Sequence, residues 1–263
     1  MADYEVSKIM WVAIVVALAA SIFVVAKPQV TSLAEGVFDN VAQVVNGTST
    51  GNDDNSEMVV ASADYGKNAI LEVNDSGQAT VRPKDNSNII EGVTPFTELK
   101  SDSLTPEVVD SIKTLDYSTK VKIVGDEASG TLYGTGLFQN SSLESIDVSN
   151  FDTSEATDLS GMFNGATQVK TITGLDKLDV SKVTRLDNFF MQCGQLTNAG
   201  DLSNWDVSNV NYFNSMFMGT SNLKSVGDLE KWQVSDAGKS TASASQGSQT
   251  FAMSGLDVPS WGK

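Results

Sequence analysis

The feature that most constrains this fold is a repeat in the C-terminal half of the chain. Asp152, Asp179 and Asp206 recur at intervals of 27 residues, and several apolar positions keep the same step. Self-similarity at such a period is typical of a solenoid, in which each unit buries its apolar side against the next unit. The equivalent apolar sets are Phe151, Leu178, Trp205 and Trp232; Leu159, Leu186 and Phe213; Phe163, Phe190 and Phe217; and Val169, Leu196 and Leu223.

Within one unit, the pattern predicts a helix followed by a short strand. Ser154 stands where it can cap a helix, and Leu159, Met162 and Phe163 would share one face of that helix. Residues 168–172 alternate between polar and apolar side chains, as a half-buried strand does. A helix and a strand in every unit correspond to the plan of a leucine-rich repeat.

The columns of large apolar residues are expected to form the core of the repeat. For Trp205 and Trp232 a second interpretation stays open, because a stack of tryptophans can also form a partly exposed binding stripe. Cys193 aligns with small residues of neighbouring units, which favours a packing role over a reactive thiol. The predicted repeat core comprises Phe163, Phe190, Phe217, Leu178, Trp205 and Trp232.

The repeats also carry a family resemblance. The segments SLESIDVSNFDTSEATDLSGMFNGA, LDKLDVSKVTRLDNFFMQCGQL and LSNWDVSNVNYFNSMFMGTSNL resemble the repeats of BspA-like bacterial leucine-rich-repeat surface proteins, over residues 136–263. The resemblance implies an extracellular, cell-surface protein that binds host or matrix partners and has no catalytic activity. Unlike many relatives, this chain has no C-terminal wall-sorting motif and no lipobox cysteine.

An apolar segment near the N-terminus is the candidate anchor. Residues 9–26 contain Ser21 as their single polar side chain. As a helix they would extend roughly 27 Å, which is close to the thickness of the hydrocarbon core of a bilayer. A cleaved signal peptide is less consistent with Asp3 and Glu5, because such peptides begin with a basic region. The apolar side chains expected to contact lipid or other copies include Trp11, Ile14, Leu18 and Phe23.

A second apolar stripe continues beyond Pro28, where a continuous helix would be kinked. Residues 1–46 therefore resemble the N-terminal helix of a pilin, whose apolar half packs in a filament core. The alternative is a single-pass anchor that carries an adhesive head. We predict the filament, because neighbouring copies would cover the stripe, which comprises Val30, Leu33, Val37, Phe38 and Val41.

The remaining segments complete the expected organisation. The expected fold class is α+β: a long N-terminal hydrophobic helix, a small strand-rich unit and a leucine-rich-repeat-like solenoid. Turn-forming residues Asn74–Gly77 between two short apolar runs predict a hairpin, and Thr105 with Pro106 predicts the start of a short helix. The expected divisions are a kinked helix over 1–46, a linker over 47–57, the strand-rich unit over 58–135 and the solenoid over 136–263.

Composition argues against most catalytic chemistry. The chain has no His and one Cys, so pairs of nucleophile and histidine base are excluded, as are most zinc sites. Its formal charge of −16 disfavours nucleic acid as a partner. We expect no catalytic residues, no cofactor and no metal, since the aspartate columns lack a calcium-loop motif. A glycan-active enzyme with paired carboxylates is the remote alternative.

The expected partners follow from these features. They are other copies of the chain or a lipid bilayer, contacted through residues 9–26, and a protein or glycan ligand on the solenoid. The sequence therefore predicts a non-enzymatic adhesive protein of the bacterial cell surface.

Overall fold

The structure is a computed structural model that describes most of the chain from Met58 to Lys263. Within that range it leaves out residues 86, 92–94, 97–98, 100–103, 124, 127–130, 133–134 and 244–248. Residues from Glu57 to Lys263 form one compact unit. The predictions for residues 1–57, including the kink at Pro28, the apolar stripe and the anchor segment, lie outside the described residues.

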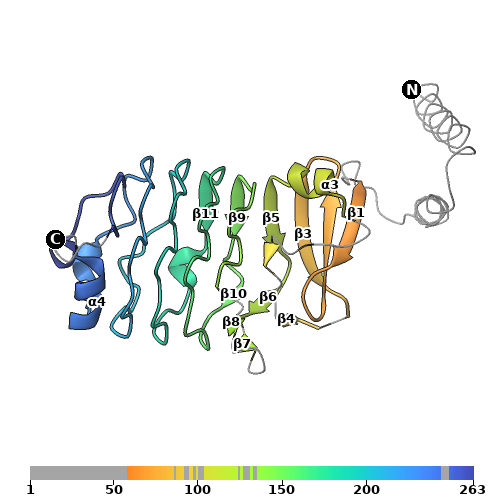
Figure 1. The fold of residues 1–263 in the computed structure, drawn as a ribbon. Coiled ribbons are helices and arrows are strands. Elements are labelled where there is room, and N and C mark those ends of the chain that lie inside the picture. Colours follow the sequence, from red (N-terminus) through yellow and green to blue (C-terminus); the bar gives the residue numbers. More distant parts are fainter. Residues whose placement is uncertain are drawn as a thin grey trace, which may run out of the picture. The chain divides into compact units, whose positions relative to one another are not determined.

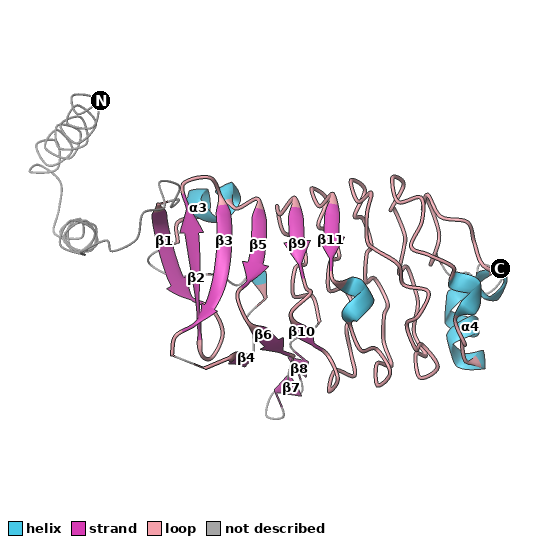
Figure 2. Ribbon diagram, turned by 180° about the vertical axis from the view of Figure 1, so that it is seen from behind, coloured by secondary structure: helices cyan, strands magenta, loops and turns pink. Residues whose placement is uncertain are grey.

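The described elements are mainly short strands joined by turns (Figures 1 and 2). The helices are α3 (Pro106–Ser111) and α4 (Asp236–Ala242), with 3-10 turns η2 (Leu175–Lys177), η3 (Leu229–Lys231) and η5 (Ser260–Gly262). The strands are β1 (Val59–Asp64), β2 (Ala69–Asn74), β3 (Gln78–Pro83), β4 (Ile89–Glu91), β5 (Thr114–Tyr117), β6 (Lys120–Lys122), β7 (Gly125–Asp126), β8 (Thr131–Leu132), β9 (Ser145–Asp147), β10 (Phe151–Asp152) and β11 (Thr171–Thr173).

This inventory corrects the expected fold class. For the described residues the α+β assignment, with a helix in every repeat, is wrong: they hold two short α-helices, and strands and turns dominate them. The expected long N-terminal hydrophobic helix lies outside the described residues. Among the described residues, the structure contains no helix with the length and apolar character needed to cross a membrane.

A sheet of six strands connects the first part of the unit to the repeats. Its order is β1-β2-β3-β5-β9-β11, antiparallel from β1 to β3 and parallel from β3 onward. The predicted hairpin is confirmed as β2 and β3, and the Asn74 side chain accepts hydrogen bonds from the backbone N–H groups of Ser76 and Gln78 in its turn. The predicted short helix is confirmed as α3, capped by Thr105. The strand-rich part and the repeats therefore share one sheet.

Each repeat forms one coil, and successive coils lie side by side from β5 toward α4 (Figure 1). β5, β9, β11 and the bridge from Thr171 to Asn198 make the side that we call the strand face. A second side, the bridge face, consists of residues 157–160, 184–187 and 211–214, joined by parallel bridges from Asp158 to Arg185 and from Arg185 to Tyr212.

The segment predicted as a helix is a run of overlapping turns, which we call the turn ladder (residues 161–166, 188–193 and 215–220). Within one coil, Asn164 N donates to Gly161 O at 2.9 Å and Ala166 N donates to Phe163 O at 3.0 Å. The intervening N–H groups donate to the next coil, as Phe163 N does to Phe189 O at 3.0 Å. In an α-helix each N–H group bonds within the helix. In the turn ladder, every second N–H group donates to a carbonyl of the next coil instead.

Left-handed backbone conformations make this ladder possible. Gly161 and Gly165 have φ values of 63° and 72°. The corresponding residues of the next coils also have positive φ: Asn188, Gln192, Ser215 and Gly219. Glycine adopts this conformation without steric cost and asparagine adopts it more readily than most residues, whereas a helix requires negative φ throughout. The i, i+3, i+4 spacing of Leu159, Met162 and Phe163 suits the turns as well as it suits a helix.

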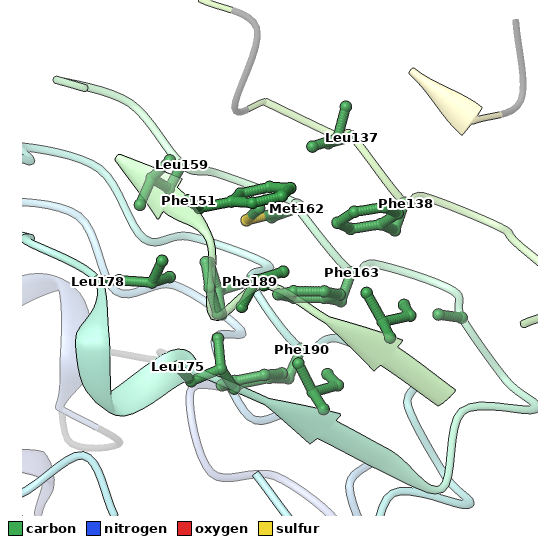
Figure 3. Packing of buried hydrophobic residues seen from close by; sticks show 14 of the residues in the cluster. Leu137, Phe138, Phe151, Leu159, Met162, Phe163, Leu175, Leu178, Phe189 and Phe190 are labelled. Carbon is green, nitrogen blue, oxygen red and sulfur yellow. The ribbon is translucent and has the colours of Figure 1, made fainter. Parts of the chain in front are cut away.

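The core is built from aromatic stacks that run across the coils (Figure 3). Ring centroids are 5.3 Å apart for Phe138 and Phe163, 5.8 Å for Phe163 and Phe190, and 5.6 Å for Phe190 and Phe217. Phe251 ends this stack 5.4 Å from Phe217. Stacked rings of this kind contribute about 0.5–1.5 kcal/mol per pair beyond area burial.

A second stack, of tryptophans, packs in the core against Phe189 and Phe213. Trp205, Trp232 and Trp261 stack at 6.1 and 5.6 Å, and each indole N–H donates to a leucine carbonyl of the preceding coil at 2.8 Å. The tryptophans thus bury a large apolar surface with every polar atom paired.

The last coil is closed by α4 and by the chain that follows it. Thr241 Oγ1 donates to Asn211 O at 2.8 Å, and Phe217 N donates to Thr250 O at 2.9 Å, which extends the turn ladder by one more coil. Trp261 completes the tryptophan stack. This closing segment covers apolar residues that a further repeat would otherwise bury.

Candidate functional site

Each segment of the bridge face directs one buried side chain into the core, and its other residues lie at the surface. Leu159, Leu186 and Phe213 point inward and are fully buried. The residues that precede them, Asp158, Arg185 and Tyr212, form an outward row across three coils. Successive side chains of an extended backbone point to opposite sides, so each coil contributes one outward side chain to this row. The row is the candidate site.

Arg185 is the centre of the row. Its Nε lies 3.6 Å from Asp158 Oδ2, and its Nη2 donates to Asp187 Oδ2 at 3.1 Å. The Cζ atom lies 4.4 Å from the centroid of the Tyr212 ring, which is a cation–π contact. Two carboxylates and one aromatic ring therefore hold the guanidinium in a defined orientation.

One carboxylate oxygen of Asp187 is buried without a directed hydrogen bond. Its Oδ1 lies 3.0 Å from Arg185 Nη2, yet the geometry does not make a directed hydrogen bond, and no other described group donates to this buried oxygen. The Arg185 side chain is 41 % exposed, so each ion pair contributes at most about 1 kcal/mol to stability. The ion pairs of this cluster therefore add little to the stability of the fold.

Tyr212 is the large aromatic residue that this face exposes. It is 42 % exposed, whereas the aromatic rings of the two stacks described above are buried or half-buried. A tyrosine with an accessible ring edge and hydroxyl group offers both apolar contact and hydrogen bonding at little entropic cost. It is therefore the natural anchor of a binding surface on this face.

The backbone beneath the row is rigidly connected. Thr184 N and Thr184 Oγ1 both donate to Thr157 O, at 2.8 and 3.1 Å, and Asn211 N donates to Thr184 O at 2.9 Å. These bonds link three consecutive coils just ahead of Asp158, Arg185 and Tyr212. The outward side chains consequently stand on a preorganised support.

The aspartate columns have a local structural role. Asp152, Asp179 and Asp206 each accept a hydrogen bond from the backbone N–H two residues later, at 3.2, 2.9 and 3.1 Å. The expected helix cap by Ser154 is wrong, because no helix follows and the aspartate is the acceptor in this turn. Among the described residues, no group of three carboxylate, Cys or His ligands converges as a metal site would require.

The acidity of these aspartates follows from the same contacts. The Lys120 ammonium, 2.8 Å away, and the Ser154 hydroxyl lower the pKa of Asp152 to about 2. Hydrogen bonds from Ser181 and Ser208 lower the pKa values of Asp179 and Asp206. These carboxylates therefore stay ionised at neutral pH, which does not suit a general acid.

The residues predicted for the repeat core lie inside the coils. Phe163, Phe190 and Phe217 are fully buried. Leu178, Trp205 and Trp232 are at most 5 % exposed, so the tryptophans are core residues and do not form a binding stripe. The Cys193 thiol is buried, donates to Phe163 O at 3.1 Å, and has its pKa raised to about 12 by desolvation.

The predicted assembly and anchor residues, from Trp11 to Val41, lie outside the described residues. Sequence reasoning missed the row of Asp158, Arg185 and Tyr212. Their spacing could have revealed them. Asp158, Arg185 and Tyr212 recur every 27 residues, each directly before a core residue, but the three side chains are acidic, basic and aromatic. A column that keeps its spacing but changes its side chain is typical of an exposed surface built on a repeated scaffold.

Comparison with known proteins adds one finding. Residues 135–257 match the model of a family described as Mycoplasma protein of unknown function, DUF285. The chain matches no curated protein and no solved structure. The match covers the bridge face, the phenylalanine stack, and Trp205 and Trp232 of the tryptophan stack.

Proposed function

We propose that this chain is a non-enzymatic binding protein of the bacterial cell surface, and that the bridge face of its solenoid binds a protein or glycan ligand. The observation that carries this proposal is Arg185, held between Asp158 and Asp187 over the half-exposed ring of Tyr212. Arginine and tyrosine are, with tryptophan, the residues enriched among those that dominate binding energy at interfaces.

The architecture supports a binding role for this face. The coils beneath it are held by hydrogen bonds from one coil to the next, so a ligand need not order the surface when it binds. The resemblance of the repeats to BspA-like surface proteins supports adhesion as the purpose of such binding. The apolar residues 9–26 would hold the chain at the cell surface.

The filament prediction concerns residues 1–46, which lie outside the described residues, and it stays a prediction of the sequence. The bridge-face proposal does not depend on it. A head displayed by a filament and a head displayed by an anchor would present the same row of side chains.

A binding survey tests the proposal. The full chain is applied to an array of host-type glycans and to immobilised fibronectin, laminin and collagen. We expect binding to at least one probe, weakened about tenfold or more by Tyr212→Ala and by Arg185→Ala, since truncation of a central anchor commonly costs this much. Gln195→Ala, at an exposed position outside the bridge face, is the matched control and should bind as the parent does.

Binding that both bridge-face variants retain in full would contradict the proposal, as would the absence of binding to every probe. Thermal unfolding of each variant distinguishes loss of the ligand contact from loss of the fold. Tyr212 is 42 % exposed, so Tyr212→Ala should leave the unfolding midpoint nearly unchanged. Arg185→Ala removes the cation beside the 13 % exposed Asp187 side chain and should lower the midpoint without abolishing the cooperative transition.

A further inference from the structure

A cleft of about 260 Å³ lies between the last repeat coil and the chain that returns to close it. Residues 224–230 form one wall, and residues 256–259 form the other. The first wall contains η3, and the second wall ends just before Trp261, which is stacked on Trp232 in the core. Both walls of the cleft are thus held in place: the first is part of the last coil, and the second is held by the stacking of Trp261 on Trp232.

The two walls are held together by Glu230. Its carboxylate accepts hydrogen bonds from Ser260 N at 2.8 Å and from Ser260 Oγ at 2.6 Å. These bonds lower the pKa of Glu230, so the group is anionic at neutral pH. The lining of the cleft consequently includes a carboxylate in a fixed position.

The lining of the cleft combines apolar surface with an excess of negative charge. Asp228, Glu230 and Asp257 contribute three carboxylates, and Lys224 contributes one ammonium group. Asp228 Oδ1 also accepts a hydrogen bond from Glu230 N at 3.1 Å, and the Lys263 ammonium acts on Glu230 from outside the lining. Lys224 Nζ donates to Ser221 O at 2.7 Å, so it is partly engaged by its own coil. The apolar surface that the cleft exposes comes mainly from Leu256 and Val258, since Val226, Leu229 and Pro259 are buried.

We propose that this cleft binds the side chain of a lysine or arginine from a partner polypeptide. Such side chains have an aliphatic stem and a cationic head, and they bury the stem on apolar surface while the head meets an anion. The volume suits one side chain and is small for a larger ligand. The formal charge of −16 on the chain also raises the local concentration of cationic partners.

The arrangement is specific to the closing end of the solenoid. Asp176, in η2, occupies the repeat position of Glu230 two coils earlier, because 230 − 176 is twice the 27-residue period. Residues 256–259 follow the last coil and line the cleft beside η3. Asp176 is therefore an acidic residue at the same repeat position, but residues 256–259 do not lie beside it. It serves below as the control position. This inference goes beyond the bridge-face proposal and uses none of its residues.

Titration of the full chain with capped amino acids tests the inference. N-acetyl-arginine amide and N-acetyl-lysine amide should shift the backbone amide resonances of Gly227 and Gly255, and added salt should weaken the effect. N-acetyl-norleucine amide, which has an aliphatic side chain without the charge, should give at least fivefold weaker binding. Glucose serves as the probe for a glycan ligand and should leave these resonances unchanged.

Substitution of Asp257 identifies the site. Asp257 is exposed, and Asp257→Lys should weaken binding of the arginine derivative at least fivefold, because it replaces an attractive charge by a repulsive one. Asp176→Lys makes the same change in net charge at an exposed position and should leave the affinity unchanged. The peptide Ac-Gly-Arg-Gly-amide should bind at least fivefold more tightly than methylguanidinium, which carries the same single charge without the aliphatic stem.

Several outcomes would overturn the inference. They are equal binding of the norleucine and lysine derivatives, equal effects of the Asp257 and Asp176 substitutions, resonance shifts confined to other residues, or binding of methylguanidinium or glucose as strong as that of the arginine peptide. Failure here would leave the bridge-face proposal intact, because Tyr212→Ala and Arg185→Ala test that surface separately.

Discussion

At the scale of single residues, the aromatic stack gives the sharpest test of the core. Phe190 is fully buried between Phe163 and Phe217, and all three rings are nearly parallel. Phe190→Ala should lower the free energy of unfolding by about 3–5 kcal/mol, because it removes a large buried ring from a site that cannot collapse without breaking the register of both neighbours. Chemical denaturation measures this change.

Phe251 provides the matched control for that prediction. It ends the same stack and is only half-buried, with Phe217 as its stacked neighbour. Phe251→Ala should therefore cost clearly less than Phe190→Ala. An equal or greater loss at Phe251 would show that closing the solenoid matters more than the stack itself.

At the scale of elements, the turn ladder depends on left-handed residues at fixed positions. Gly219 and Gln192 occupy equivalent positions in consecutive coils, with φ values of 77° and 63°. A Cβ on Gly219 would meet its nearest neighbour, Gln192 Cα, at 3.4 Å, so space is available and the backbone conformation decides the cost. A non-glycine residue in this conformation costs about 1–2 kcal/mol.

Two reciprocal substitutions should therefore change stability in opposite directions. Gly219→Ala should destabilise the unit by about 1 kcal/mol, and Gln192→Gly should stabilise it by a similar or smaller amount. Gly194→Ala is the control: a Cβ there would meet one backbone oxygen at 3.7 Å, and its backbone is not left-handed. If Gly219→Ala and Gln192→Gly change the unfolding midpoint in the same direction, the ladder does not limit stability as argued.

At the scale of the whole molecule, the division of the chain predicts an autonomous unit. Residues from Glu57 to Lys263 form a compact unit with a core that runs from Ala63 to Trp261. A fragment that begins at Glu57 should unfold in one cooperative transition and should retain the midpoint of the full chain, as measured by thermal circular dichroism. A broad or shifted transition would show that residues 1–56 complete the core.

The sequence by itself determined the period of the repeat and the membership of its core columns. Both depend on local spacing: an apolar residue that returns every 27 positions must meet its equivalent whenever units stack, whatever their backbone conformation. The hairpin at Asn74–Gly77 and the start of α3 at Thr105 were predictable for the same reason, since turn and capping residues act over a few positions.

Only the tertiary structure decided whether the unit contained a helix or a turn ladder. Leu159, Met162 and Phe163 fit either conformation, and the choice was made by hydrogen bonds to the next coil that no single unit contains. The contact of Arg185 with Tyr212 joins two consecutive coils, and the cleft beside Glu230 needs the chain to return after α4. Local spacing specifies what each coil buries, whereas the functional surfaces arise from contacts between coils, which the spacing alone does not encode.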